Sequence, residues 1–424
     1  MQITVENAGG CKRIIRAEIP ANLVNEKLSE GFREINRQVV FPGFRKGKAP
    51  RQVLEKRFGT DVKNDVRQAL ADDALKQAVE ANALKILGQA ELVGAVDLNP
   101  GAAAVLTLEA EVYPDFEVPE YKGLKVDRPS PKVEDHEIYA RQRTEQMSDG
   151  KLDPVEGAAK KGHLLRANVR VTHGEEVIFR QNGGLLEVGY AWIAGLKPVN
   201  GEKELVGLKA GDSKELTAKL PDDFGRDDLK GKDCNIHIEI SEVLTYDGPD
   251  LAEFAKAKGK ESLAAWGEEA KTALMSQKET DIDRYVEEKV IQQVLEKTNM
   301  DLPEKFSTRK AAELVQQEAY RMYRGGVGEE EIRQFLAENK DKGVDEVKNM
   351  LKRAFVIDAI ARKERVIVTE DEVNREISRI AAAVGRTTEE LTAEFQQRGT
   401  ISGMREEMKT AKVLKLLREK AKYA

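Results

Sequence analysis

The chain has 424 residues, a length that favours two to four domains, and a hydrophobic fraction of 40% supplies enough apolar side chains for real cores. Aromatic residues make up only 5% and charged residues 34%, with a mean hydropathy of −0.53, which favours long solvated helices over one compact enzyme with a deep apolar pocket. The formal net charge of −6 excludes a global electrostatic attraction to nucleic acid or anionic lipid, so any such attraction must be local.

The sequence carries no export or membrane signal. No run of 18 apolar residues occurs, and the first residues, Met1 to Glu6, lack the basic and apolar regions of a signal peptide. Only two cysteines are present, Cys11 and Cys234, far apart in the sequence. This usage is typical of a reducing compartment and excludes a cysteine-based metal site. We therefore expect a cytoplasmic protein that makes no membrane contact.

The first segment, residues 1–115, predicts a small α+β domain. An alternating, strand-like run extends from Lys12 to Ile19, and a second such run covers 106–112. Between them, two segments repeat apolar residues at steps of three and four, which indicates two amphipathic helices. The apolar positions are Leu23, Val24, Leu28, Phe32, Ile35 and Val39 in the first helix, and Val53, Leu54, Phe58, Val62, Val66 and Leu70 in the second.

A basic, glycine-punctuated loop joins the two predicted helices, with the sequence Gly43-Phe44-Arg45-Lys46-Gly47-Lys48-Ala49-Pro50. Gly43 and Gly47 permit backbone angles that other residues resist, and the flanking prolines end one helix and open the next. The loop is therefore expected to keep one shape. It presents Phe44, Arg45 and Lys46 outward, as a docking tip rather than a catalytic loop.

Positive charge is concentrated around this loop. From Arg33 to Arg57 there are eight basic residues against two acidic ones, a local balance of about +6, whereas residues 1–116 as a whole are near neutral. A solvated face is the ordinary explanation of such a charge run. The glycines, the prolines and the central Phe44 favour a binding surface instead.

Three further segments follow along the chain. Residues 116–150 are marked by prolines and predict an extended linker that contains a short helical stretch at 134–147. Residues 151–246 are rich in glycine and in strand-like alternation, which predicts a compact β-rich domain. Residues 247–424 carry helical periodicity almost throughout, so an all-α domain is expected.

The common catalytic signatures are absent. There is no phosphate-binding loop, no nucleophile elbow and no zinc-protease helix motif, so nucleotide-driven work is not expected. The four histidines lack metal-ligand spacing and receive no role: His136, His163, His173 and His237. Two acidic pairs are interpreted as solvated turn residues: Asp222-Asp223 and Asp227-Asp228. We expect no cofactor and no metal.

Over nearly its full length the chain resembles the bacterial trigger factor family of ribosome-associated chaperones. Its basic loop is similar to the ribosome-docking signature of that family, and this resemblance implies Phe44, Arg45 and Lys46 as the docking core, supported by Gly43, Gly47, Lys48 and Pro50. Weaker support comes from two C-terminal segments, Asp301-Leu302-Pro303-Glu304 and 361–373. The chemistry agrees, because two cations can pair with RNA phosphate or acidic protein side chains while an aromatic ring packs beside them. In the first C-terminal segment, Asp301 is expected to cap the helix that Pro303 opens.

The β-rich segment resembles the FKBP-like prolyl isomerase module of the same family, through Gly207-Leu208-Lys209-Ala210-Gly211-Asp212, Leu220-Pro221-x-x-Phe224-Gly225 and Leu229-Lys230-Gly231-Lys232. Such a module lowers a rotation barrier of about 18–20 kcal/mol by means of an apolar, aromatic-lined pocket. Two aromatic positions of the family pattern are replaced here, by Asn168 and Leu196. The candidate pocket residues, each alternatively a core residue, are Phe179, Tyr190, Trp192, Ile193, Leu196 and Phe224.

Two functions of different classes stay open. The first is an ATP-independent holdase that docks on the large ribosomal subunit, at ribosomal protein and rRNA near the nascent-chain exit, and binds nascent or unfolded polypeptides. The alternative is primarily a prolyl isomerase that its other domains deliver to substrates. A free nucleic-acid-binding protein ranks last, because the N-terminal domain is near neutral. The amphipathic helices would also permit a homodimer off the ribosome. The client surface is expected in a region that includes Met322, Tyr323, Phe335, Met350 and Met404.

Overall fold

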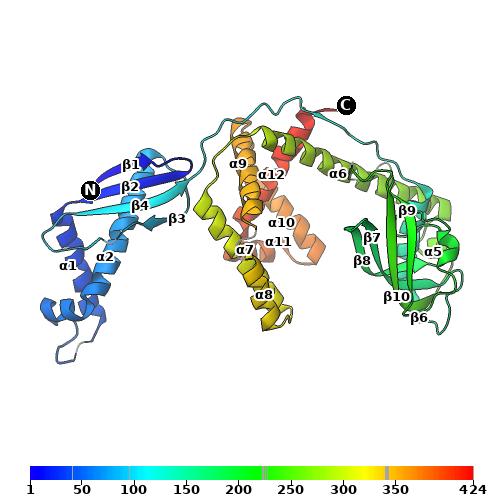
Figure 1. Cartoon of the computed structure of the whole chain (residues 1–424), viewed down its shortest axis with the longest axis horizontal. Helices are drawn as coiled ribbons and strands as arrows, with labels where there is room; N and C mark the ends of the chain where they lie inside the picture. The colour runs from blue at the N-terminus through cyan, green and yellow to red at the C-terminus, as the bar shows by residue number, and fades with distance from the viewer. Residues whose placement is uncertain are drawn as a thin grey trace. The chain divides into compact units, whose positions relative to one another are not determined.

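The structure, a computed structural model, describes residues 1–40, 42–94, 96–221, 224, 226, 228–339 and 343–423. It divides the chain into two compact units. The first joins residues 1–125 to residues 287–422, and the second holds residues 126–286 together with the end of the chain. The predicted fold class is confirmed: an α+β region comes first, a β-rich region follows, and the last part is helical (Figure 1). In the described part of the chain, no helix is both long and apolar enough to cross a membrane.

The α+β part of the first unit contains a four-stranded antiparallel sheet. Its strands lie in the order β1 (Gln2–Asn7), β2 (Lys12–Ile19), β4 (Ala104–Val112) and β3 (Ile86–Leu92). Along β4 every second side chain is buried, which is the period expected of a strand with one covered face. In the central pair of strands, Ile15 of β2 lies opposite Leu108 of β4, and both side chains contribute to one core.

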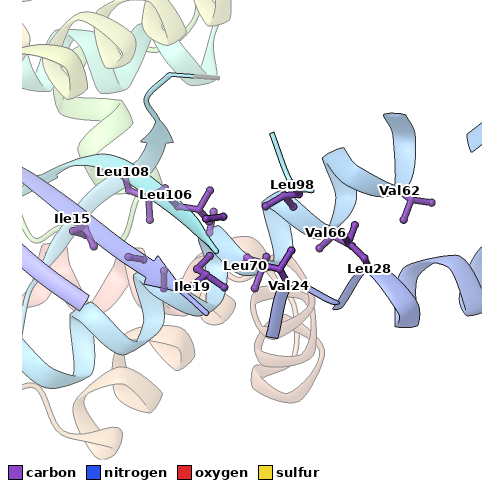
Figure 2. Packing of buried hydrophobic residues seen from close by; sticks show 14 of the residues in the cluster. Ile15, Ile19, Val24, Leu28, Val62, Val66, Leu70, Leu98, Leu106 and Leu108 are labelled. Carbon is purple, nitrogen blue, oxygen red and sulfur yellow. The ribbon is translucent and has the colours of Figure 1, made fainter. Parts of the chain in front are cut away.

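Two helices, α1 (Ala21–Gln38) and α2 (Arg51–Asn82), complete this core. Figure 2 shows their apolar side chains beside those of the strands, with Ile15, Ile19, Val24, Leu28, Val62, Val66, Leu70, Leu98, Leu106 and Leu108 labelled. Gly31 lets the helices approach closely, because an added Cβ there would lie 2.9 Å from a methyl group of Val62. With 32 residues, α2 is about 48 Å long at 1.5 Å per residue. The two helices therefore carry their connecting loop well beyond the sheet (Figure 1).

The helical part of the first unit is built from the C-terminal end of α6 and the six helices after it. Their bounds are α6 (Leu263–Lys297), α7 (Glu304–Arg324), α8 (Glu329–Asn339), α9 (Val344–Lys363), α10 (Glu370–Val384), α11 (Thr388–Arg398) and α12 (Thr400–Lys420). Helix α9 lies against both α7 and α12. A separate cluster joins α10, α11 and α12 through Val373, Ile377, Ala381 and Leu391, with Met404 packed against it. The short strands β5 (Lys125–Val126) and β11 (Lys422–Tyr423) form a two-stranded sheet.

Within the first unit, the sheet caps helix α7. The N-cap of α7 is Pro303, which has no capping side chain, and the predicted cap Asp301 does not take that role. Instead, the Glu111 carboxylate on β4 accepts hydrogen bonds from the backbone N–H groups of Lys305 at 3.0 Å and Phe306 at 2.6 Å. A carboxylate at a helix N-terminus satisfies amides that have no partner inside the helix and also opposes the helix dipole. The backbone carbonyl of Asp301 instead accepts a hydrogen bond from the Cys11 thiol at 3.2 Å.

The second unit is centred on a five-stranded sheet. Four of its strands lie in the order β6 (Lys151–Pro154), β10 (Asp233–Asp247), β7 (Leu164–His173) and β8 (Glu176–Glu187). The fifth strand, β9 (Ser213–Lys219), pairs with β10. All of these pairs are antiparallel. One face is covered by an apolar core that includes Leu165, Ala167, Val169, Val171, Ile236, Ile238 and Ile240. The helices of this unit are α3 (Asp135–Asp149), α4 (Gly201–Glu204), α5 (Leu251–Ala257) and the N-terminal part of α6.

Candidate functional site

The loop between α1 and α2 is tied to the helix that precedes it. The Asn36 side chain accepts a hydrogen bond from the Ala49 backbone N–H and donates one to the Ala49 carbonyl, both at 3.2 Å. Ala49 is buried at 8% exposure, so the descending end of the loop is held against the last turns of α1. The next residue, Pro50, then opens α2. These contacts fix where the loop leaves and rejoins the helices.

The tip of the loop is a tight turn. The Lys48 N–H donates to the Arg45 carbonyl at 2.9 Å, which closes a four-residue β-turn. Gly47 is the third residue of this turn and has a φ of 81°, in the region that a type II turn requires there. Gly43, at the entry to the tip, has a φ of 86°. The glycines therefore stand where the backbone needs them, as the sequence predicted.

The side chains of the tip point into solvent. Phe44 is 39% exposed, and Arg45, Lys46 and Lys48 are exposed as well. Among the described residues, no carboxylate lies within ion-pair distance of these three cations, whereas nearby Arg51 pairs with Glu55 at 2.7 Å. The tip thus offers uncompensated positive charge and one aromatic face to an external surface, which is the combination that attracts phosphate or carboxylate groups.

The candidate isomerase residues of the β-rich module fall into two groups and one outlier. Ile193 and Leu196 are buried at 1% and 7% exposure and exchange two backbone hydrogen bonds across the turn that Gly195 makes at a φ of 75°. Phe224 packs against the same core. Phe179, on strand β8, is 43% exposed and lies apart from them. Three of the six residues are therefore brought together, in the core.

The second group, Tyr190 and Trp192, packs on helix α3. The Trp192 ring stacks on the His136 ring with centroids 3.4 Å apart, and the Tyr190 hydroxyl donates to the His136 carbonyl at 3.0 Å. Tyr139 of the same helix lies 4.7 Å from the Tyr190 ring and donates to Glu187 at 2.9 Å. Burial, with Glu187 beside it, raises the pKa of Tyr139, so its hydroxyl stays a donor. The segment expected to be an extended linker thus supplies a helix that covers part of the module.

This helix contact was missed at the sequence level. His136 received no role, because a lone histidine gives no hint of a stacking partner 56 positions away. The sequence predicts a short helical stretch at 134–147, but a helical pattern does not say which surface such a helix covers.

Asn168 requires a correction. It was expected at an aromatic pocket position, but its side chain is exposed, while Ala167 and Val169 on either side have 0% exposure. Successive side chains of a strand point to opposite faces, so a shift of one residue moves a position from the core to the solvent. The inward position of this stretch is held by Val169, and Asn168 belongs to the outer face of the sheet.

The β-rich module carries an open pocket of about 630 Å³. Its lining includes Trp192, Leu196, Lys197, Val199 and Pro221. Among the described lining residues are two of the six candidates, Trp192 and Leu196. The other four are not among them: Phe179, Tyr190, Ile193 and Phe224. The candidate residues are therefore not gathered around a single cavity. Asp222, Asp223 and Asp227 lie outside the described residues, so their expected solvation stays a prediction.

The predicted client region contains an apolar groove between α7 and α8. The groove has a volume of about 410 Å³, and its apolar lining is Ala319, Tyr320, Tyr323, Ile332 and Leu336. Tyr320 and Tyr323 are 64% and 63% exposed, which is high for large aromatic side chains. Of the residues expected from the sequence, Tyr323 lines the groove and Met350 is exposed elsewhere, whereas Met404 packs against the cluster of α10 to α12.

Comparisons with known proteins agree with these features. The model of the family described as bacterial trigger factor protein matches residues 1–145, and the model of its C-terminus matches residues 262–419. The chain belongs to the bacterial trigger factor family. The trigger factor of Halothermothrix orenii is 28% identical and that of Anoxybacillus flavithermus 26%, with 99% and 98% of both chains covered. A solved structure of the trigger factor chaperone covers 99% of both chains with a TM-score of 0.53 at 20% identity, which supports the fold.

Membership of the trigger factor family confirms the resemblance drawn from the loop and from the C-terminal segments. The loop and both of its helices lie inside the first match, and the groove between α7 and α8 lies inside the second. The β-rich module lies between the two matches, in a part of the chain that the full-length trigger factor relatives also span.

Proposed function

We propose that this protein is an ATP-independent, ribosome-associated chaperone that docks through the tip of the loop between α1 and α2. The observation that carries the proposal is the shape of that loop: Asn36 fixes its base, Gly47 closes its turn, and Phe44, Arg45 and Lys46 are left exposed. Family membership supports the same assignment. Because translation takes place in the cytoplasm, the proposal implies a cytoplasmic protein.

The proposed docking partner is the large ribosomal subunit near the nascent-chain exit. Arg45 and Lys46 would pair with rRNA phosphates or with acidic side chains of a ribosomal protein, and Phe44 would pack against an apolar spot between them. The chain as a whole adds no general attraction, because its net charge is −6. Binding therefore depends on the tip and weakens as salt screens its charges.

We propose the groove between α7 and α8 as part of the client-binding surface. Exposed aromatic and aliphatic side chains in a shallow groove bind unfolded segments without demanding one sequence. Accordingly, residues 1–115 would dock, 116–150 would link, 151–246 would form an FKBP-like module, and 247–424 would hold clients. Self-association of the free protein through its amphipathic helices is the corresponding proposal for the state off the ribosome.

Site-specific crosslinking tests docking and client binding in one experiment. A photoreactive phenylalanine analogue replaces Phe44 in one variant of the full chain and Tyr323 in another, and each is irradiated on ribosomes stalled with a labelled nascent chain. We expect position 44 to crosslink to ribosomal protein or rRNA and position 323 to the nascent chain. Docking through the loop is refuted if position 44 yields no more ribosomal product than position 323.

Prolyl isomerisation is the second candidate function, and the pocket beside Trp192 and Leu196 favours it. An apolar pocket can stabilise the twisted amide of an X-Pro bond without any proton transfer. In a proline-peptide assay on the full chain, isomerase activity predicts turnover above the uncatalysed rate, lost in Trp192→Ala and kept in Phe179→Ala, a change at an aromatic residue outside the lining. Turnover at the uncatalysed rate in the unaltered protein rules this function out.

A further inference from the structure

Two arginines face each other on the outer face of the β-rich module. Arg170 of β7 is directly opposite Arg180 of β8 in the antiparallel register, and both side chains are exposed. Directly opposed side chains of such a pair have Cβ atoms about 4.5–5.5 Å apart, and like charges in this position destabilise a sheet. The repulsion between the two arginines therefore destabilises this part of the sheet in the isolated protein.

The two arginines are uncompensated, unlike the others of the module. Residues 151–246 contain four arginines, of which Arg166 pairs with Glu242 at 2.8 Å and Arg226 pairs with Asp228 at 2.7 Å. Within the described residues, neither Arg170 nor Arg180 has a carboxylate within ion-pair distance. Their guanidinium groups are thus available to an anion from outside the chain.

The arginine pair lines a hollow of about 240 Å³ on this face. The other lining residues are Asn168, Val169, Asn182, His237 and Glu239. The His237 ring is already engaged, by Glu215 at 2.6 Å and Thr172 at 3.2 Å, and so leaves the arginines as the charged donors of the site. The fork of donors on a guanidinium matches a carboxylate in two parallel hydrogen bonds. The chemistry of the hollow therefore suits a carboxylate.

Strand β8 is the edge of its sheet. A free sheet edge can bind an extended peptide, so a peptide is favoured as the source of the carboxylate. The strand order ends at β8 (Figure 1), and among the described residues no backbone hydrogen bond from outside the sheet reaches 177–186. An exposed edge strand offers unpaired N–H and C=O groups to an extended chain. A strand added there would place every second side chain on the face that carries Arg180. A polyphosphate is disfavoured by Glu239 in the lining and by the net charge of −6.

We propose that the edge of β8 takes up an extended segment of a client polypeptide whose acidic side chains, at alternate positions, bind the Arg170–Arg180 pair. The proposal rests on the proposed chaperone function and specifies one class of client segment. The added strand satisfies the edge of the sheet, and its carboxylates remove the repulsion between the two arginines.

The test uses the full-length protein and fluorescent twelve-residue peptides, with binding measured by fluorescence anisotropy. One peptide alternates Glu with Val or Thr, a second has Gln at every Glu position, and a third has the same composition as the first with its glutamates contiguous. Two exposed ion pairs predict roughly fivefold tighter binding of the alternating Glu peptide than of the Gln peptide. We expect the preference to vanish in Arg170→Gln/Arg180→Gln and to persist in Arg166→Gln, a matched change at a paired arginine of the same strand.

Four results would overturn the proposal. These are equal binding of the Glu and Gln peptides to the unaltered protein, a preference that survives in the double variant, equally tight binding of the contiguous peptide, and displacement of the peptide by single-stranded RNA as readily as by unlabelled peptide. Suppression of aggregation of denatured lysozyme is measured on the same preparations. If suppression persists in the unaltered protein while the peptide preference fails, the inference about β8 is wrong and the chaperone function stands.

Discussion

Asn36 links the two ends of the proposed docking loop through one side chain. It sits near the end of α1, and both of its amide hydrogen bonds go to the backbone of Ala49, 13 residues later. A single side chain that satisfies a donor and an acceptor of the same residue acts as a clasp. The loop is therefore held at its base by Asn36 and closed at its tip by the hydrogen bond from Lys48 to Arg45.

Replacing Asn36 with alanine should loosen the loop. Loss of two hydrogen bonds predicts a decrease of about 1–2 kcal/mol in the free energy of unfolding. It also predicts faster tryptic cleavage after Arg45, Lys46 or Lys48 in the folded protein. The control is Asn64→Ala, because Asn64 is exposed and accepts a hydrogen bond from Arg67 on the surface of the same helix, α2. Cleavage of the Asn36 variant at the rate of the control would show that the clasp does not hold the loop.

At the residue scale, sequence reasoning worked where local chemistry decides the outcome. Positive φ at Gly43 and Gly47 follows from the backbone angles that glycine adopts most readily, and the exposure of Phe44 follows from its place at a turn. Sequence reasoning failed where the register of a strand decides which side chains face the core. Asn168 was expected at a pocket position of the family pattern but lies on the outer face of the sheet. A one-residue shift reverses every side chain of a strand, and a single sequence does not fix that shift.

Helix α10 begins with a capping box that is reinforced from another helix. Glu372 accepts from the backbone N–H of Thr369 at 2.9 Å, and the Thr369 hydroxyl accepts from the Glu372 N–H at 3.4 Å. Lys412 of α12 lies 2.6 Å from the same carboxylate. The hydrogen bond from Lys412, followed by that from Thr369, lowers the pKa of Glu372 to about 2. The start of α10 thus depends on an ionised Glu372.

This cap makes the stability of the helical part depend on pH. The folded pKa lies below the ordinary value of 4.5, so the contribution of the carboxylate is complete above about pH 4.5 and is lost as the pH falls toward 2. Glu372→Gln should therefore lower the midpoint of thermal unfolding at pH 7 and reduce the drop between pH 7 and pH 3. Circular dichroism measures both.

The control for this change is Glu389→Gln, at an exposed glutamate in the first turn of α11. We expect it to unfold as the unaltered protein does at both pH values. If Glu372→Gln also keeps the full drop between pH 7 and pH 3, the assignment of this pH dependence to the cap is incorrect.

Elements were predictable from the sequence where their periodicity is strong, and their ends were less so. The spacing of apolar residues predicted both α1 and α2, because apolar positions at steps of three and four define one buried face of a helix. The cap of α7 was assigned to Asp301 on local grounds, whereas Glu111 supplies it from 195 residues earlier. No local pattern contains that information, because the cap exists only once β4 and α7 are folded.

At the scale of the molecule, the proposed activities occupy separate surfaces. The docking tip and the groove between α7 and α8 belong to the first unit, while the pocket beside Trp192 and the β8 edge belong to the second. The net charge of −6 gives no general attraction to RNA, so the basic run around the tip must determine which part of the chain meets an anionic surface. Each surface can therefore be altered without removing the others.

The central claim is docking through the tip, and ribosome co-sedimentation at two salt concentrations tests it most directly. The triple variant Phe44→Ala/Arg45→Ala/Lys46→Ala is compared with the unaltered protein and with Tyr323→Ala/Arg324→Ala, which removes an exposed aromatic and an exposed cation at the end of α7. We predict binding about tenfold weaker or more for the triple variant, unchanged binding for the double variant, and weaker binding of the unaltered protein at high salt. Co-sedimentation of the triple variant at the level of the unaltered protein would contradict the account.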